Sequence, residues 1–266
     1  MNNITSAMMD FMSMDELSKG SSFVHARHPI AKLLTTIVYI AVVISFDILD
    51  LSALVPMVLI PIVIFGLSGI EVKVCFFKIR IILPFILAVG IWNPILNRTP
   101  VINIGLLVIT EGMVSLLTLI LKSLLALMMS FLMVATTGID GICVALRRIR
   151  IPGIFVSLIL LTYRYISVLL KEAEILWTAY SLRAPGQRGV RIDAWGSYLG
   201  QLLLRSMDRS NELYASMRLR GFNGEFAYAD TRKIDAFDVL FTLVIIALSL
   251  IFRLVNVSDL IGNLFI

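Results

Sequence analysis

The residues best suited to recognise a partner lie at the ends of two predicted helices. One end reads Ala179-Tyr-Ser-Leu-Arg183-Ala184, and the other, thirty-seven residues later, reads Ser216-Met217-Arg-Leu-Arg220-Gly221-Phe222. A small residue four positions before an arginine lies on the same helix face, so a partner can approach the backbone while the guanidinium reaches a carboxylate. The helix dipole also favours a single arginine at a C-terminus. The repetition of the pattern favours a docking element with two sites.

Other residue types that bind metals are sparse. His25 and His28 are the only histidines, and no third ligand follows at a useful spacing, so we expect solvated or interfacial rings and no metal site. The two cysteines, Cys75 and Cys143, are unpaired in the sequence pattern and are predicted to be buried apolar thiols.

Two charges interrupt a long apolar run. Glu111 and Lys122 are eleven residues apart, close to three helical turns, so they share a helix face about 16 Å apart. Charged side chains inside membrane spans are usually functional, and these two are therefore marked as candidates.

The motifs of several enzyme classes are absent from the sequence. The apolar runs contain no His-x-x-x-His, Gly-x-Gly-Asp or Gly-x-Ser-x-Gly, which argues against an intramembrane enzyme. No Gly-x-x-x-x-Gly-Lys-Ser/Thr loop occurs, so this chain does not hydrolyse ATP itself. We expect a non-catalytic chain without a bound cofactor.

The elements that position these residues must fold in a lipid bilayer. Of 266 residues, 59% are hydrophobic and 15% are charged, which is too little polar surface for a compact body in water. Five apolar runs predict membrane spans, at residues 33–49, 51–70, 81–96, 105–135 and 236–257. A tight turn is expected between Asp47 and Asp50, and a charged loop at residues 71–80.

The distribution of Lys and Arg predicts the orientation. Nineteen of the 23 cations fall in segments that would face the cytoplasm, ten of them at residues 171–235, whereas the outer segments hold only Arg98 and Arg253. The N-terminus and the polar segment are therefore expected in the cytoplasm of a multi-pass plasma-membrane protein, with the C-terminus outside. The net charge of +5 then reflects orientation and not nucleic-acid binding.

The segment between the fourth and last spans predicts two long helices. Residues 153–183 contain no interior breaker and end at Ala184-Pro185-Gly186; residues 194–220 follow, with Asp193 as N-cap and Gly221 as the stop. The second helix is amphipathic and too polar to span. The apolar run 151–170 is interpreted as an interfacial helix, because a crossing would carry ten cations outside; a sixth span is the alternative. Three regions result: a membrane bundle at 1–137, cytoplasmic helices at 138–235 and a C-terminal span at 236–266.

The sequence resembles the transmembrane (T) component of energy-coupling factor transporters, in its cobalt/nickel form. The resemblance rests on the order of the spans and on Arg164-Tyr165-Ile166 followed by Glu172, the Ala179-x-x-x-Arg183 end, and Arg205 through Arg220-Gly221-Phe222-Asn-Gly224. The chain departs from the family pattern at Ala184, where glycine is common, and at Ser216, where alanine is common. It also reads His28-Pro29-Ile30-Ala31-Lys32 where Asp-Pro-Arg-x-Lys is common.

This resemblance implies an all-α membrane protein with about five transmembrane helices and two long crossing cytoplasmic coupling helices. Two ABC ATPase subunits would bind at Arg183 and Arg220, and a substrate-capturing membrane subunit would contact the upper helix faces, at Leu158, Leu161, Leu202 and Leu203. Arg164, Tyr165 and Glu172 would be structural or interfacial. The complex would import cobalt or nickel ions. A vitamin-type T component and a self-contained secondary transporter are the alternatives.

Overall fold

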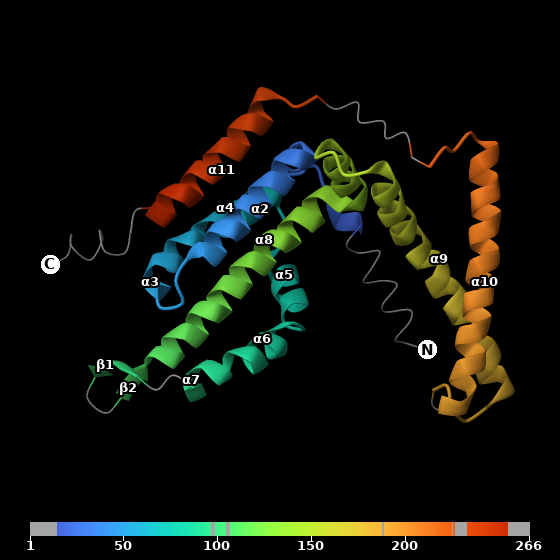
Figure 1. Cartoon of the computed structure of the whole chain (residues 1–266), viewed down its shortest axis with the longest axis horizontal. Helices are drawn as coiled ribbons and strands as arrows, with labels where there is room; N and C mark the ends of the chain where they lie inside the picture. The colour runs from blue at the N-terminus through green and yellow to red at the C-terminus, as the bar shows by residue number, and fades with distance from the viewer. Residues whose placement is uncertain are drawn as a thin grey trace. The chain divides into compact units, whose positions relative to one another are not determined.

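The computed structural model describes residues 15–96, 99–104, 107–187, 189–224, 226 and 233–254. The chain divides into two compact units. One, here called the bundle unit, comprises Leu17–Gly138 and Arg232–Ile266; the other, the hairpin unit, comprises Met1–Glu16 and Ile139–Thr231. Figure 1 labels the helices and strands of both units, and each unit is described by itself.

The bundle unit is built on helix α2 (Pro29–Ser45), which packs against α11 (Ala236–Leu254). Pro29 stands in the first turn, where a proline costs no helical hydrogen bond, as expected from the sequence. The His28 ring caps this end, its Nδ1 accepting from the backbone N–H of Ile30 at 3.2 Å. The Tyr39 hydroxyl, fully buried, donates to the carbonyl of Met57 at 2.9 Å and so fixes α2 against the next helix.

The second apolar run forms a nearly continuous helix after the predicted tight turn. It consists of α3 (Leu51–Leu54), a 3-10 segment η1 (Val55–Val58) and α4 (Leu59–Ser68). The helix stops at Gly69, whose φ of 69° is the left-handed conformation that glycine adopts readily.

The predicted charged loop at residues 71–80 is wrong, because it folds as helix α5 (Val72–Ile79). Cys75 and Ile79 are buried on one face of α5, so four-residue spacing of apolar side chains outweighs the intervening lysines. Helices α6 (Leu83–Gly90) and α7 (Trp92–Leu96) follow. The third predicted span, residues 81–96, divides into α6 and α7, and α5 meets the segment Leu83–Ile95 at a bend of 55°.

The fourth predicted span begins later and ends later than expected. Strands β1 (Pro100–Ile104) and β2 (Leu107–Thr110) form an antiparallel hairpin, and helix α8 then runs from Glu111 to Arg148. Residues 107–110 are apolar and β-branched enough to extend as a strand. Helix α8 is broken at Gly138, where φ is 65° and ψ is 169°.

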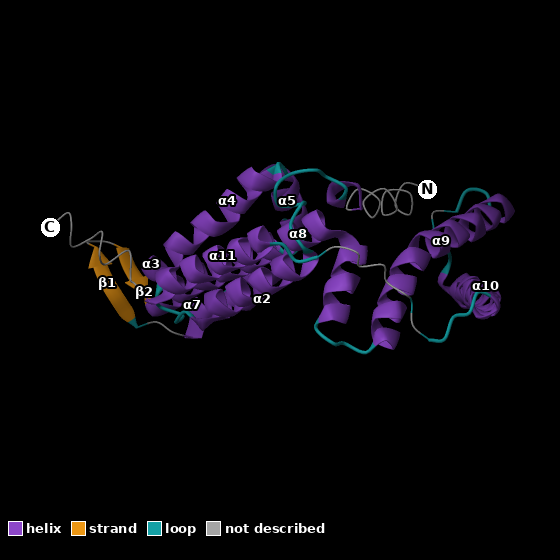
Figure 2. Ribbon diagram, turned by 90° about the horizontal axis from the view of Figure 1, so that it is seen from above, coloured by secondary structure: helices purple, strands orange, loops and turns teal. Residues whose placement is uncertain are grey.

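The hairpin unit contains helices α9 (Gly153–Arg183) and α10 (Ile192–Leu219), which pack on each other (Figures 1 and 2). The bounds of α9 match the prediction. The expected N-cap Asp193 is wrong: Arg191 is the N-cap, and Asp193 lies in the first turn, where its charge still favours the helix N-terminus.

Four helices within the described ranges are long and apolar enough to cross a bilayer: Leu51–Ser68, α8, α9 and α11. The bent α5–α6 pair would make a fifth, and α2, with 17 residues, is shorter. The prediction of an all-α membrane protein with about five spans is confirmed. Helix α9 meets the criteria for a span by length and composition, and its interfacial position remains a prediction.

Candidate docking site

The first arginine end is exposed at the C-terminus of α9. Ala179 and Arg183 are exposed one turn apart on α9, and within the described ranges the Arg183 guanidinium contacts no carboxylate. Ala184 caps the helix with its N–H donating to the carbonyl of Tyr180 at 3.0 Å. Its φ is −128°, which any residue adopts, so alanine replaces the usual glycine here without strain. The Tyr180 hydroxyl then accepts from the N–H of Arg191 and fixes the loop to α10.

The second arginine end is a complete Schellman motif. The N–H of Phe222 donates to the carbonyl of Met217, and the N–H of Gly221 to that of Arg218, both at 3.0 Å. Gly221 has φ of 83°, so this position requires glycine in a way that Ala184 does not. Arg220 is the C-cap, and its exposed side chain has no acidic partner in the part of the chain that the structure describes. Ser216, also exposed, bonds back to the carbonyl of Leu213 at 2.8 Å.

The hairpin that α9 and α10 form holds the two arginine ends apart. The end of α9 lies beside the start of α10, because Tyr180 contacts Arg191. The 28 residues of α10 then carry Arg220 about 40 Å from that point, at 1.5 Å per residue. Two separate partners, or two copies of one partner, can therefore bind without competing for the same surface.

Polar contacts connect α9 to α10 between these ends. Arg205 Nη1 lies 3.0 Å from Glu172 Oε2, and the Tyr198 hydroxyl donates to the carbonyl of Ala173 at 2.8 Å. Burial raises the pKa of the Tyr198 phenol above its ordinary value of 10.0. Arg205 and Glu172, both quoted for the resemblance, are thus partners in one contact across the helices. A crevice of about 290 Å³ beside them is also lined by Asp208, Arg209 and Glu212.

One face of α10 is apolar and uncovered. Trp195, Leu199, Leu203 and Met207 recur every four residues, all are exposed, and none of the residues of α10 is buried. Among the other predicted contact residues, Leu158 is exposed, while Leu161 and Leu202 are partly buried. An exposed apolar stripe of this length marks a surface that another molecule covers.

The remaining predicted site residues lie near the start of α9. The guanidinium of Arg164 lies 3.7 Å from the carboxylate of Asp140, and both side chains are exposed. Tyr165 is partly buried. The pair connects α9 to the final turns of α8, and the structural or interfacial role of Arg164 stays a prediction.

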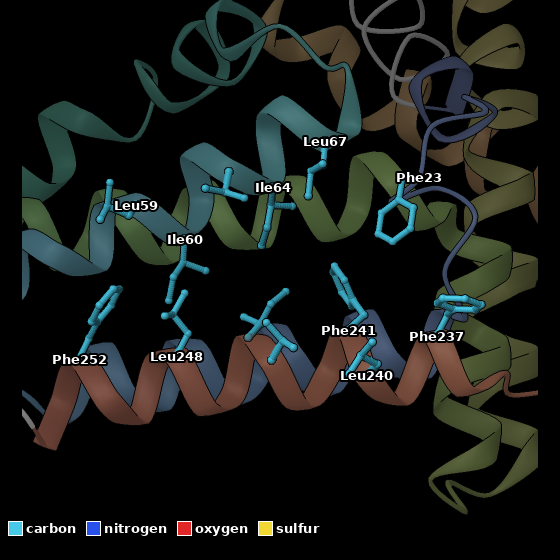
Figure 3. A pocket seen from close by; sticks show the side chains of 13 residues that line it. Phe23, Leu59, Ile60, Ile64, Leu67, Phe237, Leu240, Phe241, Leu248 and Phe252 are labelled. Carbon is cyan, nitrogen blue, oxygen red and sulfur yellow. The ribbon is translucent and has the colours of Figure 1, made fainter.

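The two histidines do not share a site. His25 Nδ1 lies 2.7 Å from Ser22 Oγ and its Nε2 lies 2.9 Å from the carbonyl of Leu17, whereas His28 caps α2. The described residues contain no group of three or more His, Cys, Asp or Glu side chains that could hold a metal ion. A groove of about 450 Å³ between α4 and α11 is lined by apolar side chains alone (Figure 3).

Lys122, marked in the sequence, contacts the C-terminus of α2. Its ammonium donates to the carbonyls of Ile44 and Phe46, and the Arg253 guanidinium donates to the carbonyl of Ser45 at 3.0 Å. Carbonyls at a helix C-terminus lack helical partners, and cations there are favoured by the dipole. Lys122 therefore stabilises a helix end, and Glu111 is separate from it, in the first turn of α8.

Sequence reasoning assigned no contact to two buried charged residues of the bundle unit, Lys32 and Asp238. Asp238 accepts hydrogen bonds from the N–H groups of His28 and Asp235, at 3.0 and 3.1 Å, and lies 3.7 Å from Arg27. The spacing Asp235-x-x-Asp238 at the start of α11 is a signal for it, because a carboxylate three residues into a helix reaches back to the N-cap.

Comparison with known proteins gives one family. The family model CbiQ, described as cobalt transport protein, matches residues 20–229. An uncharacterized protein of Methanocaldococcus jannaschii is 25% identical over 148 residues, 53% of this chain and 50% of that protein. The cobalt transport protein CbiQ of Rhodobacter capsulatus is 33% identical over 100 residues, 36% of this chain and 40% of that protein. The chain thus aligns with at most half the length of these relatives.

Proposed function

The chain belongs to the CbiQ family of cobalt transport proteins, and from that membership we propose that it is the energy-coupling membrane subunit of an ATP-driven importer. Two cytoplasmic ABC ATPases bind the arginine ends of α9 and α10, and a separate membrane subunit captures the ion. The observation that carries the proposal is that the guanidinium groups of Arg183 and Arg220 contact no carboxylate within the described ranges and lie about 40 Å apart along the α9–α10 hairpin.

The chemistry of each end suits a carboxylate on a partner protein. An arginine presents a planar fork of donors that binds a carboxylate in two-point geometry. The small residues one turn earlier, Ala179 and Ser216, leave the helix surface open beside it. Two similar ends on one chain match two ATPases, which act as a pair when they bind and hydrolyse ATP.

The apolar stripe of α10 serves the second interaction in this proposal. Its side chains lie on the exposed surface of α10, and Leu203 and Leu158 are among the exposed residues. We assign this face, with the upper part of α9, to the capture subunit. Closure of the ATPase pair would move the two helix ends, and the helices would carry that movement to the captured ion.

Cobalt is the proposed ion, because the family and one relative are described as cobalt transport proteins. Nickel has similar ligand preferences and is the second candidate ion. The orientation proposed from the cation distribution puts the N-terminus and both arginine ends in the cytoplasm, where ATP is available.

Co-purification tests the docking assignment. Arg183→Glu and Arg220→Glu, singly and together, are compared with Lys171→Glu, a charge reversal on the exposed middle of α9. Each single variant should lose about half of the bound ATPase, the double variant should lose nearly all, and the control should lose none. A double variant that retains both ATPases would show the assignment to be wrong.

A further inference from the structure

The break in α8 is capped by a lysine from another helix. At Gly138 the backbone leaves the helical conformation, so the carbonyls of the preceding turn lose their usual partners. The Lys32 side chain, buried in α2, donates from Nζ to the carbonyl of Thr136 at 2.8 Å. A charged donor thus satisfies a backbone group that the break has freed.

A second residue closes the other side of the break. A Cβ atom placed on Gly138 would lie 2.8 Å from Ser18 Oγ and 3.1 Å from Ser18 Cβ. The φ of 65° also disfavours any residue with a side chain. The break therefore needs glycine both for its backbone conformation and for the close approach of Ser18.

The helix that carries Lys32 is anchored one turn before it. One turn earlier, the N–H of His28 donates to the buried carboxylate of Asp238, which anchors the start of α2 to the start of α11. A cavity of about 20 Å³ borders Lys32 together with Thr35 and Thr36, and it is large enough for one water molecule. Buried ammonium groups are costly unless they are hydrogen-bonded, and the carbonyl of Thr136 supplies such a bond to Lys32.

The break at Gly138 lies at the boundary between the two units. The chain passes from the bundle unit to the hairpin unit directly after Gly138. The backbone direction at Gly138 therefore sets the direction in which residue 139 leaves the bundle unit. A residue that holds the backbone here acts at the point where the chain leaves the bundle unit.

We propose that Lys32 is a positioning residue for energy coupling, because its hydrogen bond to Thr136 holds the break at Gly138 as a stiff joint. The hydrogen bond and the break are observed in the structure, while the part of the joint in coupling rests on the proposed function. Lys32 touches neither an ATPase nor the ion in this proposal. It acts through the backbone of α8.

Hydrogen–deuterium exchange tests the joint without reference to transport. The variants are Lys32→Met, which removes the donor at similar length, and Lys32→Arg, which keeps a donor. Lys122→Met, which removes a different lysine that caps a helix end, is the matched control. Lys32→Met should raise the exchange rate of amides 136–142 about tenfold or more, because that turn opens more often. Lys32→Arg should restore part of the protection, and Lys122→Met should leave these amides unchanged.

Transport assays with the full complex test the coupling role. In proteoliposomes, Co²⁺ taken up per ATP hydrolysed should fall severalfold in Lys32→Met while both ATPases still co-purify. Gly138→Ala should lower the same ratio, and Gly200→Ala, where a Cβ meets no atom within 4 Å, should not. The ratio separates positioning from general destabilisation, which would lower uptake and ATPase activity together.

Three results would overturn the proposal. Unchanged amide exchange at residues 136–142 in Lys32→Met would show that Lys32 does not hold the break. A loss of protection in Lys32→Arg as large as that in Lys32→Met would show the same. Faster exchange with an unaltered ratio of Co²⁺ to ATP would reduce Lys32 to a stabilising residue. Failure of the proposed function is separate: it would appear as ATPases retained by the Arg183→Glu, Arg220→Glu double variant, whatever the exchange data give.

Discussion

Removal of the Asp238 carboxylate should destabilise the bundle unit more than any exposed charge substitution. The side chain is 5% exposed and accepts two backbone hydrogen bonds, one from His28 on α2 and one from Asp235 before α11. It also lies 3.7 Å from the Arg27 guanidinium, which is 14% exposed. Asp238→Ala therefore leaves two N–H groups without their acceptor and removes the carboxylate that pairs with the largely covered Arg27 guanidinium.

The magnitude follows from these contacts. Breaking a buried ion pair by removing one partner costs about 3–5 kcal/mol, and we expect Asp238→Ala to fall in that range. Asp238→Asn keeps an oxygen for the His28 N–H, but its NH₂ group would face the Asp235 N–H. One charge-assisted bond is then lost, which costs about 1.5–3 kcal/mol.

The assay is reversible unfolding in mixed micelles, in which the fraction of SDS is raised and helicity is followed by circular dichroism. Asp193→Asn is the control, because its carboxylate also pairs with an arginine but is 65% exposed. It should change the free energy of unfolding by less than about 1 kcal/mol. If Asp238→Ala unfolds within about 1 kcal/mol of the wild type, the argument from buried contacts is refuted.

Further predictions concern helix ends and one tyrosine. Lys122→Met should lower the free energy of unfolding by about 1.5–3 kcal/mol, because carbonyls at the end of α2 lose a charged donor; an unchanged value in the same micelle assay would contradict this. Gly221→Ala should destabilise by about 1 kcal/mol because of its φ of 83°, whereas Gly200→Ala inside α10 should stabilise by a similar amount. If both variants changed the free energy of unfolding in the same direction, the comparison would be refuted. Burial raises the pKa of Tyr198, so the unfolded chain ionises first and stability should fall as pH rises above 10.0. Tyr198→Phe should flatten this fall, measured as the difference between the two pH profiles.

The predictions that held depend on local rules. The bounds of α9, the stop at Gly221 and the turn before α3 follow from breakers and spacing within a few residues. The sequence Arg220-Gly221-Phe222 forms its motif from neighbouring backbone groups alone. The resemblance that rested on this signature is confirmed by the family match.

The features that could not be predicted from the sequence depend on contacts between residues far apart in the chain. Lys32 and Thr136 are 104 residues apart, and their contact exists only because Gly138 breaks a helix that periodicity would continue. The segment at 71–80 has a charge content typical of a loop, yet Cys75 and Ile79 find buried surroundings and the helix forms.

The distance between the two candidate docking sites could be found only from the structure. Similar motifs at Arg183 and Arg220 indicate two sites, but their spacing depends on whether the helices fold back on each other. The contacts between Tyr198 and Ala173 and between Arg205 and Glu172 establish that arrangement.

ATP-dependent Co²⁺ uptake into proteoliposomes tests the central claim most directly. Vesicles with this chain alone are compared with vesicles that also hold the two ATPases and the capture subunit. We expect no uptake by the chain alone. Uptake should require ATP and all subunits, and the Arg183→Glu, Arg220→Glu double substitution should abolish it. Co²⁺ flux through the chain alone without ATP would contradict the account and would favour a self-contained secondary transporter.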